Sequence, residues 1–114
     1  MIAARGKKKW EACLPIFFAA LSLWLEAAAA DPQSGRAKAA ACTLCHGQTG
    51  ISTLPNAPHL AGQPAIYVEE QLRNYRSGRR QHEVMSVVAK PLSDADIADL
   101  AAWFATIKVE ATLP

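Results

Sequence analysis

The sequence predicts an all-α domain over residues 31–114. Three segments of this stretch carry apolar residues at helical spacing or a run of strong helix formers. Loops rich in glycine and proline separate them. No stretch alternates apolar and polar residues as a half-buried strand would. We therefore expect helices packed on helices, with no sheet.

Residues 1–30 have the features of a secretory leader. A basic head at residues 5–9 precedes an uncharged, largely apolar run of 14 residues, Ala12–Leu25, and Ala28–Ala30 then offer a small-residue cleavage site. The alternative is an uncleaved anchor, but a membrane span needs about 20 residues. We expect a signal peptide at 1–30, a mature domain at 31–114, and no stable membrane insertion after cleavage.

The mature chain is close to neutral, because it has eight basic and eight acidic residues. The net charge of +2 of the whole chain therefore belongs to the leader, and nothing indicates nucleic-acid binding. A domain of about 84 residues buries a modest core and often needs a covalent staple. Removal of Cys13 with the leader leaves only Cys42 and Cys45 for that purpose.

The first expected helix runs from about Ser34 to Cys42. It is rich in alanine, and either Ser34 or Asp31 can cap its start. Gly35 has no side chain, which would let the last helix of the chain cross closely at this point. Residues 47–62 hold three glycines and two prolines without a sustained period, so we expect a loop there.

The second expected helix begins at Pro64 and runs to about Ser77, where Gly78 can end it. Apolar residues recur along it at helical spacing. Gly78–Leu92 is expected to be another loop, and it contains Met85. The last expected helix follows Ser93–Asp96, which resembles a capping box. Its apolar stripe is Ile97, Leu100, Ala101, Phe104 and Ile107.

The first helix ends in the sequence Cys42-Thr-Leu-Cys45-His46. Two thiols separated by two residues can add across the two vinyl groups of one porphyrin, and the histidine that follows can bind the iron as proximal ligand. We therefore expect one haem c, held covalently through Cys42 and Cys45. A thioredoxin-like redox pair would need a βαβ context, and a structural zinc site would need four ligands. The sequence shows neither.

Further segments follow this motif in a characteristic order: Leu60–Gln63, Gln71–Leu72, Arg76–Arg79, Met85 and Leu92–Ile97. With them the chain from Gly35 to Phe104 resembles a bacterial class I cytochrome c. It is most similar to the small periplasmic group that includes cytochromes c-four and c-five-five-three. Cytochromes c-four carry two haem domains, whereas this chain has one. His59 also stands where that group often has asparagine.

The resemblance implies three to four helices wrapped around one covalently bound haem, with His46 and Met85 as the axial ligands of the iron. In the family, a loop proline carbonyl accepts the N–H of the ligating histidine, and Pro58 lies at the matching spacing. A methionine thioether raises the reduction potential relative to a second imidazole. His82 and His59 are the rival candidates for the sixth position.

The expected function is electron transfer in the periplasm of a Gram-negative bacterium. The protein would be a monomeric carrier and not an enzyme, and larger redox proteins would dock on it transiently. One alternative is a haem protein with an open or displaceable sixth position, for gas sensing or minor peroxidase activity. Another is a fixed cytochrome subunit of an oxidoreductase complex. Four arginines (Arg73, Arg76, Arg79 and Arg80) form either a docking patch, a partner for a haem propionate, or a solvated helix face.

Overall fold

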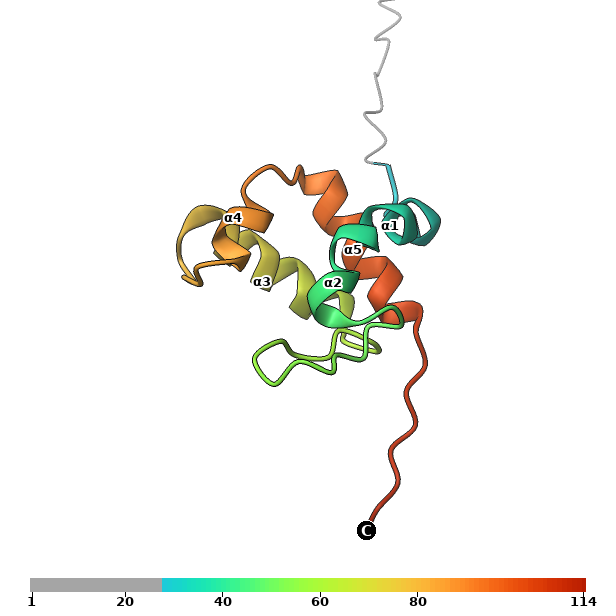
Figure 1. The fold of residues 1–114 in the computed structure, drawn as a ribbon. Helices are drawn as coiled ribbons and strands as arrows, with labels where there is room; N and C mark the ends of the chain where they lie inside the picture. Colours follow the sequence, from blue (N-terminus) through green and yellow to red (C-terminus); the bar gives the residue numbers. More distant parts are fainter. Residues whose placement is uncertain (1–27) are drawn as a thin grey trace, which may run out of the picture.

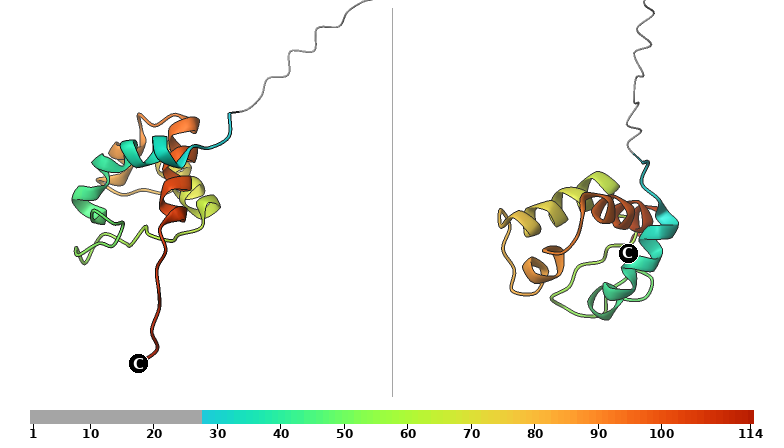
Figure 2. Two further views of the ribbon diagram at one scale, coloured as in Figure 1. Left: turned by 90° about the vertical axis from the view of Figure 1, so that its right-hand side faces the viewer. Right: turned by 90° about the horizontal axis from the view of Figure 1, so that it is seen from above.

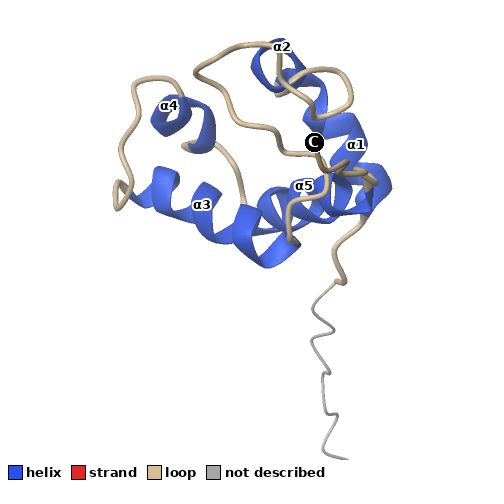
Figure 3. Cartoon of the chain, turned by 90° about the horizontal axis from the view of Figure 1, so that it is seen from below, coloured by secondary structure: helices blue, strands red, loops and turns tan. Residues whose placement is uncertain are grey.

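The computed structural model describes residues 28–114. Most of the predicted leader lies outside the described residues. The described chain is helical without strands, which confirms the all-α prediction (Figures 1 and 3). Its elements are α1 (Pro32–Lys38), a 3₁₀ turn η1 (Ala39–Ala41), α2 (Thr43–His46), α3 (Ala65–Ser77), α4 (Met85–Ala89) and α5 (Asp94–Thr106). From residue 28 onward, no helix is both long and apolar enough to cross a bilayer.

Helix α5 is the centre of the fold. It packs against both α1 and α3, while α4 packs on α3. In the right-hand view of Figure 2, α3 and α5 lie side by side, and α1 lies across the end of α5. Helices α2 and α4 lie on the same side of α3 and α5, and the loop 47–62 passes between them (Figure 3). The fold therefore presents two short helices to each other above a base of two long ones.

The buried core is small. Eight apolar residues are buried in the described chain, and four of them are alanines: Ala39, Ala61, Ala89 and Ala101. The larger ones come mainly from the predicted stripe of α5, where Ile97, Leu100 and Phe104 are buried. Cys42 and Leu72 pack against this cluster from outside. Helix α5 thus supplies most of the packing that joins the other elements.

The first helix differs from its prediction at both ends. It starts at Pro32 because the Asp31 carboxylate accepts the N–H of Gln33, so Asp31 and not Ser34 is the cap. At Ala39 the helix tightens into the η1 turn, and α2 resumes after Cys42. The cysteines consequently lie around a short second turn rather than at the end of one continuous helix.

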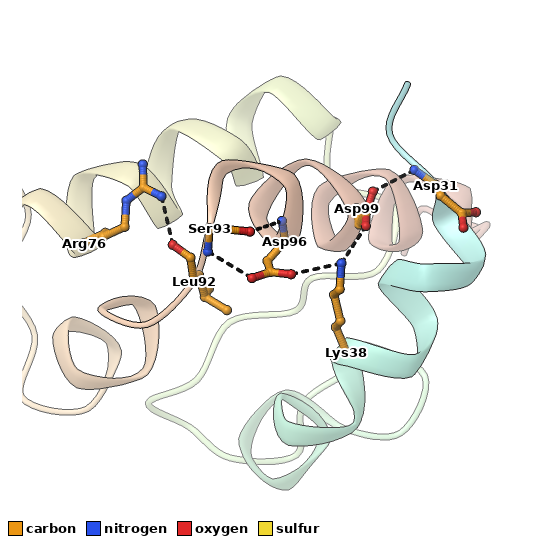
Figure 4. A network of polar contacts seen from close by, with 7 residues as sticks. All are labelled: Asp31, Lys38, Arg76, Leu92, Ser93, Asp96 and Asp99. Carbon is orange, nitrogen blue, oxygen red and sulfur yellow. Dashed lines mark hydrogen bonds and ion pairs between the residues drawn. The ribbon is translucent and has the colours of Figure 1, made fainter. Parts of the chain in front are cut away.

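The crossing of α1 and α5 depends on Gly35, as predicted. A Cβ atom at this position would lie 1.9 Å from the backbone oxygen of Asp99 and 2.9 Å from Cβ of Trp103. Two ion pairs tie the same helices together: Lys38 Nζ lies 2.6 Å from Asp99 and 3.0 Å from Asp96 (Figure 4). The backbone N–H of Asp31 also donates to Asp99.

Helix α3 follows its prediction closely. Pro64 is the residue before the first helical position, and Gly78 ends the helix in the left-handed conformation with φ of 82°. Helix α5 opens with a complete capping box, in which Ser93 and Asp96 each accept the other's backbone N–H (Figure 4). The end of α3 and the start of α5 are thus set by signals in the local sequence.

The prediction of a continuous loop over Gly78–Leu92 is wrong. The five-residue helix α4 lies within it and begins at Met85. Helix α4 has no glycine, proline or serine cap directly before it, and its contacts are with α3, far away in the sequence. Those contacts are not visible as a local sequence pattern.

Candidate haem site

The two cysteines and the histidine of the predicted attachment motif lie in one helical turn. Cys42 is the residue between η1 and α2, and its carbonyl accepts the N–H of His46 at 2.9 Å. Cys45 is three residues further on, so the two thiols come from the same side of the turn. The structure therefore brings together all three residues of the motif.

The two thiols differ in exposure. Cys42 is half-buried against the core, Cys45 is exposed, and the two form no disulfide. Burial raises the pKa of the Cys42 thiol above its usual range. Reactive redox cysteines have a lowered pKa, because the thiolate is the nucleophile. The environment of Cys42 therefore disfavours a thioredoxin-like redox pair.

His46 is held in one orientation by a backbone carbonyl. Its side chain is buried, and Nδ1 lies 2.8 Å from the oxygen of Pro58, which confirms the predicted contact. With the N–H at Nδ1, the other ring nitrogen, Nε2, keeps its lone pair for a metal. Such a hydrogen bond fixes the tautomer and makes the imidazole a better ligand.

The loop 47–62 is built to hold the Pro58 carbonyl in place. Gly47 has φ of 82°, and a Cβ atom there would lie 1.9 Å from the oxygen of Ile51. The carbonyl of Gly50 accepts the N–H groups of Leu60 and Ala61. The N–H of Gly62 donates to Phe104 at 2.9 Å, which fastens the end of the loop to α5. The glycines thus permit the tight turns that return the chain to His46.

Sequence reasoning missed Ser52, which joins this loop to the motif. Its buried hydroxyl donates to the carbonyl of Cys45 at 2.8 Å and accepts the N–H of Leu54 at 3.0 Å. The backbone N–H of Ser52 donates to Nδ1 of His59 at 2.8 Å. His59 is therefore part of the loop's internal hydrogen bonding. A serine turn between two glycine-rich stretches was the available signal.

Met85 lies on a different part of the fold. It is the first residue of α4 and is half-buried. Helix α4 packs on α3, whereas the packing partner of α2 is η1. The structure therefore places His46 on α2 and Met85 on α4, the two short helices that face each other above α3 and α5 in Figure 3.

These residues fit a covalently held haem. They supply two thiols in one turn, a buried imidazole with one nitrogen committed to Pro58, and a thioether. Four apolar side chains on or beside the segments that carry them are between 39 % and 46 % exposed: Ile51 and Leu54 in the loop, and Val84 and Val88 at α4. A large apolar ligand would cover such surface. Across residues 28–114, no three His, Cys, Asp or Glu side chains gather as a metal-binding cluster of their own.

Three of the four predicted arginines, which lie in α3 or just after it, are engaged with neighbours on the protein. Arg73 pairs with Glu69, and Arg76 reaches the Leu92 carbonyl and Asp94. Arg80 donates to Gln71 and lies over the ring of Tyr75. These pairings favour the interpretation of a helix face neutralised by its own partners over that of a basic docking patch.

The all-α fold, the attachment turn and the orientation of His46 are together the features of a small protein that binds haem covalently. Residues 33–108 match the cytochrome c family, and the chain belongs to it. Because haem c is the covalently bound cofactor of that family, the predicted cofactor is confirmed.

Within the family, the chain is similar to cytochromes of the c4 type. Cytochrome c4 from Pseudomonas aeruginosa is 45 % identical over 82 residues, which are 72 % of this chain and 41 % of that protein. Cytochrome c-554(548) from Halomonas halodenitrificans is 40 % identical over 68 % of this chain and 98 % of its own. A thiosulfate dehydrogenase electron acceptor from Thiomonas intermedia is 42 % identical over 82 % of this chain and 40 % of its own.

The fold is also similar to solved structures. Reduced recombinant cytochrome c4 from Pseudomonas stutzeri has a TM-score of 0.66 and 38 % identity, over 70 % of this chain and 47 % of that one. The chain thus spans about two fifths of the P. aeruginosa cytochrome c4 and nearly all of the Halomonas cytochrome.

Proposed function

We propose that this protein is a single-haem electron carrier and not an enzyme. The observation that carries the proposal is the hydrogen bond of 2.8 Å between His46 Nδ1 and the Pro58 carbonyl. It prepares one ring nitrogen of a buried histidine, beside two thiols, to act as a permanent axial ligand. Kinship to cytochromes c supports the same function.

In this proposal, Cys42 and Cys45 would hold the haem through two thioethers, and His46 and Met85 would bind its iron. The haem supplies a one-electron couple between ferric and ferrous iron. The Pro58 carbonyl orients His46 and increases its basicity, and the bonds of Ser52 keep the loop rigid. Met85 would contribute a soft, uncharged ligand that raises the reduction potential and blocks small molecules.

We further propose that the protein acts in the periplasm of a Gram-negative bacterium. Residues 1–30 would be the signal peptide, and 31–114 the mature cytochrome domain. The basic and apolar pattern of the leader supports export. Sequencing the mature N-terminus tests it: Asp31 as the first residue is expected, and a retained Met1 would indicate an anchor.

The partners we propose are larger redox proteins that donate and accept one electron in short-lived complexes, with the carrier itself a monomer. A second candidate function is that of a fixed subunit of an oxidoreductase complex. It is favoured by the relative named as a thiosulfate dehydrogenase electron acceptor. A carrier is expected to elute alone in gel filtration, whereas a fixed subunit would co-purify with a large partner.

The decisive experiment is the optical spectrum of the purified, reduced protein before and after addition of carbon monoxide. We expect no change in the low-spin c-type spectrum of the wild type on the timescale of mixing, and a rapid spectral change in Met85→Ala. Val87→Ala is the matched control, because Val87 is an exposed residue of the same helix. Rapid change in the wild type would instead support the gas-sensing or peroxidase alternative.

A further inference from the structure

His82 caps the segment that carries Met85. Its ring nitrogen Nδ1 accepts the backbone N–H of Val84 at 3.2 Å and that of Met85 at 3.3 Å. Its carbonyl accepts the N–H of Ser86 at 3.0 Å. In return, the Ser86 hydroxyl accepts the N–H of His82 at 3.0 Å. These four bonds make a closed ring around the first turn of α4.

The N-cap residue of α4 is Val84, whose own side chain makes no capping hydrogen bond, and the ring of His82 supplies an acceptor from two residues earlier. The first N–H groups of a helix have no partner within the helix, and a side-chain acceptor placed two or three residues earlier satisfies them. Serine, threonine, aspartate and asparagine usually fill this role; here an imidazole does. Because Nδ1 accepts, the ring proton is on Nε2.

Helix α4 depends on such help. It has five residues, and isolated helices shorter than about 12 residues are marginal in water. Only Ala89 of this helix is buried, and Met85 itself is half-buried. The ring of His82 also meets Tyr75 of α3 edge-on, with centroids 6.5 Å apart. His82 thus links the start of α4 to the long helix beneath it.

We propose that His82 is a positioning residue for Met85: through Nδ1 it fixes the backbone from which the thioether reaches the iron. The inference rests on the proposed role of Met85 as axial ligand. It assigns His82 a function other than that of rival ligand, because the imidazole acts through the backbone of Met85. Loss of the cap would increase the fraction of molecules in which Met85 has left the iron.

Three variants of the holoprotein test this proposal, compared in one alkaline buffer. His82→Ala removes the acceptor. His82→Asn restores it, because an asparagine oxygen can accept the same two N–H groups. Ser86→Ala removes only the reciprocal bond. Val87→Ala serves again as the control on the same helix.

We expect carbon monoxide to bind the reduced His82→Ala protein about fivefold faster than the wild type, corresponding to about 1 kcal/mol, the usual cost of a lost cap. The methionine-to-iron absorption band of the ferric protein should weaken, and the reduction potential should fall. His82→Asn should match the wild type in all three measurements. Ser86→Ala should change in the same direction by a smaller factor.

A readout independent of the iron is amide hydrogen exchange at Val84 and Met85. Both amides should exchange faster in His82→Ala and return to the wild-type rate in His82→Asn. Equal values for His82→Ala and the wild type in exchange and in carbon monoxide binding would overturn the proposal. So would equal losses in the alanine and asparagine variants, which would mean that the imidazole itself is the ligand. Rapid carbon monoxide binding by the wild type would instead reject the role of Met85 and, with it, the electron-carrier proposal.

Discussion

At the scale of single residues, Gly35 sets how closely α1 and α5 can approach each other. Two helices cross there with no room for a side chain, since an added Cβ would meet the Asp99 oxygen at 1.9 Å. The Asp99 oxygen belongs to the backbone of α5, so relief requires a shift of α1 away from α5.

Gly35→Ala should therefore destabilise the holoprotein by about 2 kcal/mol, in the range of overpacking substitutions. Urea unfolding followed by circular dichroism measures this loss. Ala37→Ser, at an exposed position of the same helix, should stay within about 0.5 kcal/mol of the wild type. Equal stability of the two variants would show that α1 moves without cost.

Asp96 makes the stability of the folded protein depend on pH over a defined acidic range. The backbone N–H of Ser93, the ammonium of Lys38 and the Ser93 hydroxyl lower its pKa from 3.8 to about 2. A lowered pKa means that the ionised carboxylate stabilises the folded state. This contribution is complete above the unfolded value of 3.8 and is lost as the pH falls through about 2.

The melting temperature of Asp96→Asn should therefore lie below that of the wild type at pH values above 3.8, and the gap should close as the pH falls towards 2. Thermal melts of both proteins across this range provide the measurement. For the control Glu110→Gln, in the exposed C-terminal segment, the difference in melting temperature from the wild type should not change with pH. A gap that is constant with pH would mean that the charge of Asp96 plays no part.

At the scale of elements, helix ends with local signals were predictable and those set by distant contacts were not. Gly78 ends α3 and the Ser93–Asp96 box begins α5, both as expected, because each signal lies within a few residues of the end it sets. Helix α4 was missed because its start depends on an imidazole cap and on packing against α3. The same holds for the site. The spacing of the cysteines and the histidine predicted the attachment turn, whereas the bonds from Ser52 to Cys45 and His59, each seven residues away, follow from the fold of the loop.

The capping box of α5 can be tested by Ser93→Ala. Removal of its hydroxyl leaves the N–H of Asp96 without its partner, and the cost should be about 1 kcal/mol in urea unfolding. Ser93→Asp should recover most of it. Ser77→Ala, which removes an exposed hydroxyl bonded within α3, should cost less than about 0.5 kcal/mol. Similar losses for Ser93→Ala and Ser77→Ala would contradict a special role for the cap.

At the scale of the whole molecule, the small core makes the fold depend on the haem. Among residues 28–114, half of the eight buried apolar residues are alanines, and Ile97 is the largest fully buried side chain. Apolar side chains on the loop and on α4 stay partly exposed, and α2 and α4 are held to the rest mainly through η1 and α3. Domains of this size seldom hold a unique fold with so little buried surface unless a covalent staple assists.

The double variant Cys42→Ser/Cys45→Ser should consequently lose its cooperative unfolding transition and its near-ultraviolet circular dichroism, with helix content reduced but not abolished. Without thioethers, the contribution that fixes α2 and α4 relative to each other is missing, while the pairing of α1, α3 and α5 persists as a loosely packed remnant. Thr43→Ser lies between the two cysteines and keeps both thiols, so it should unfold like the wild type. A double variant that melts cooperatively near the wild-type temperature would show that the helices alone specify the fold. The haem would then contribute little to its stability.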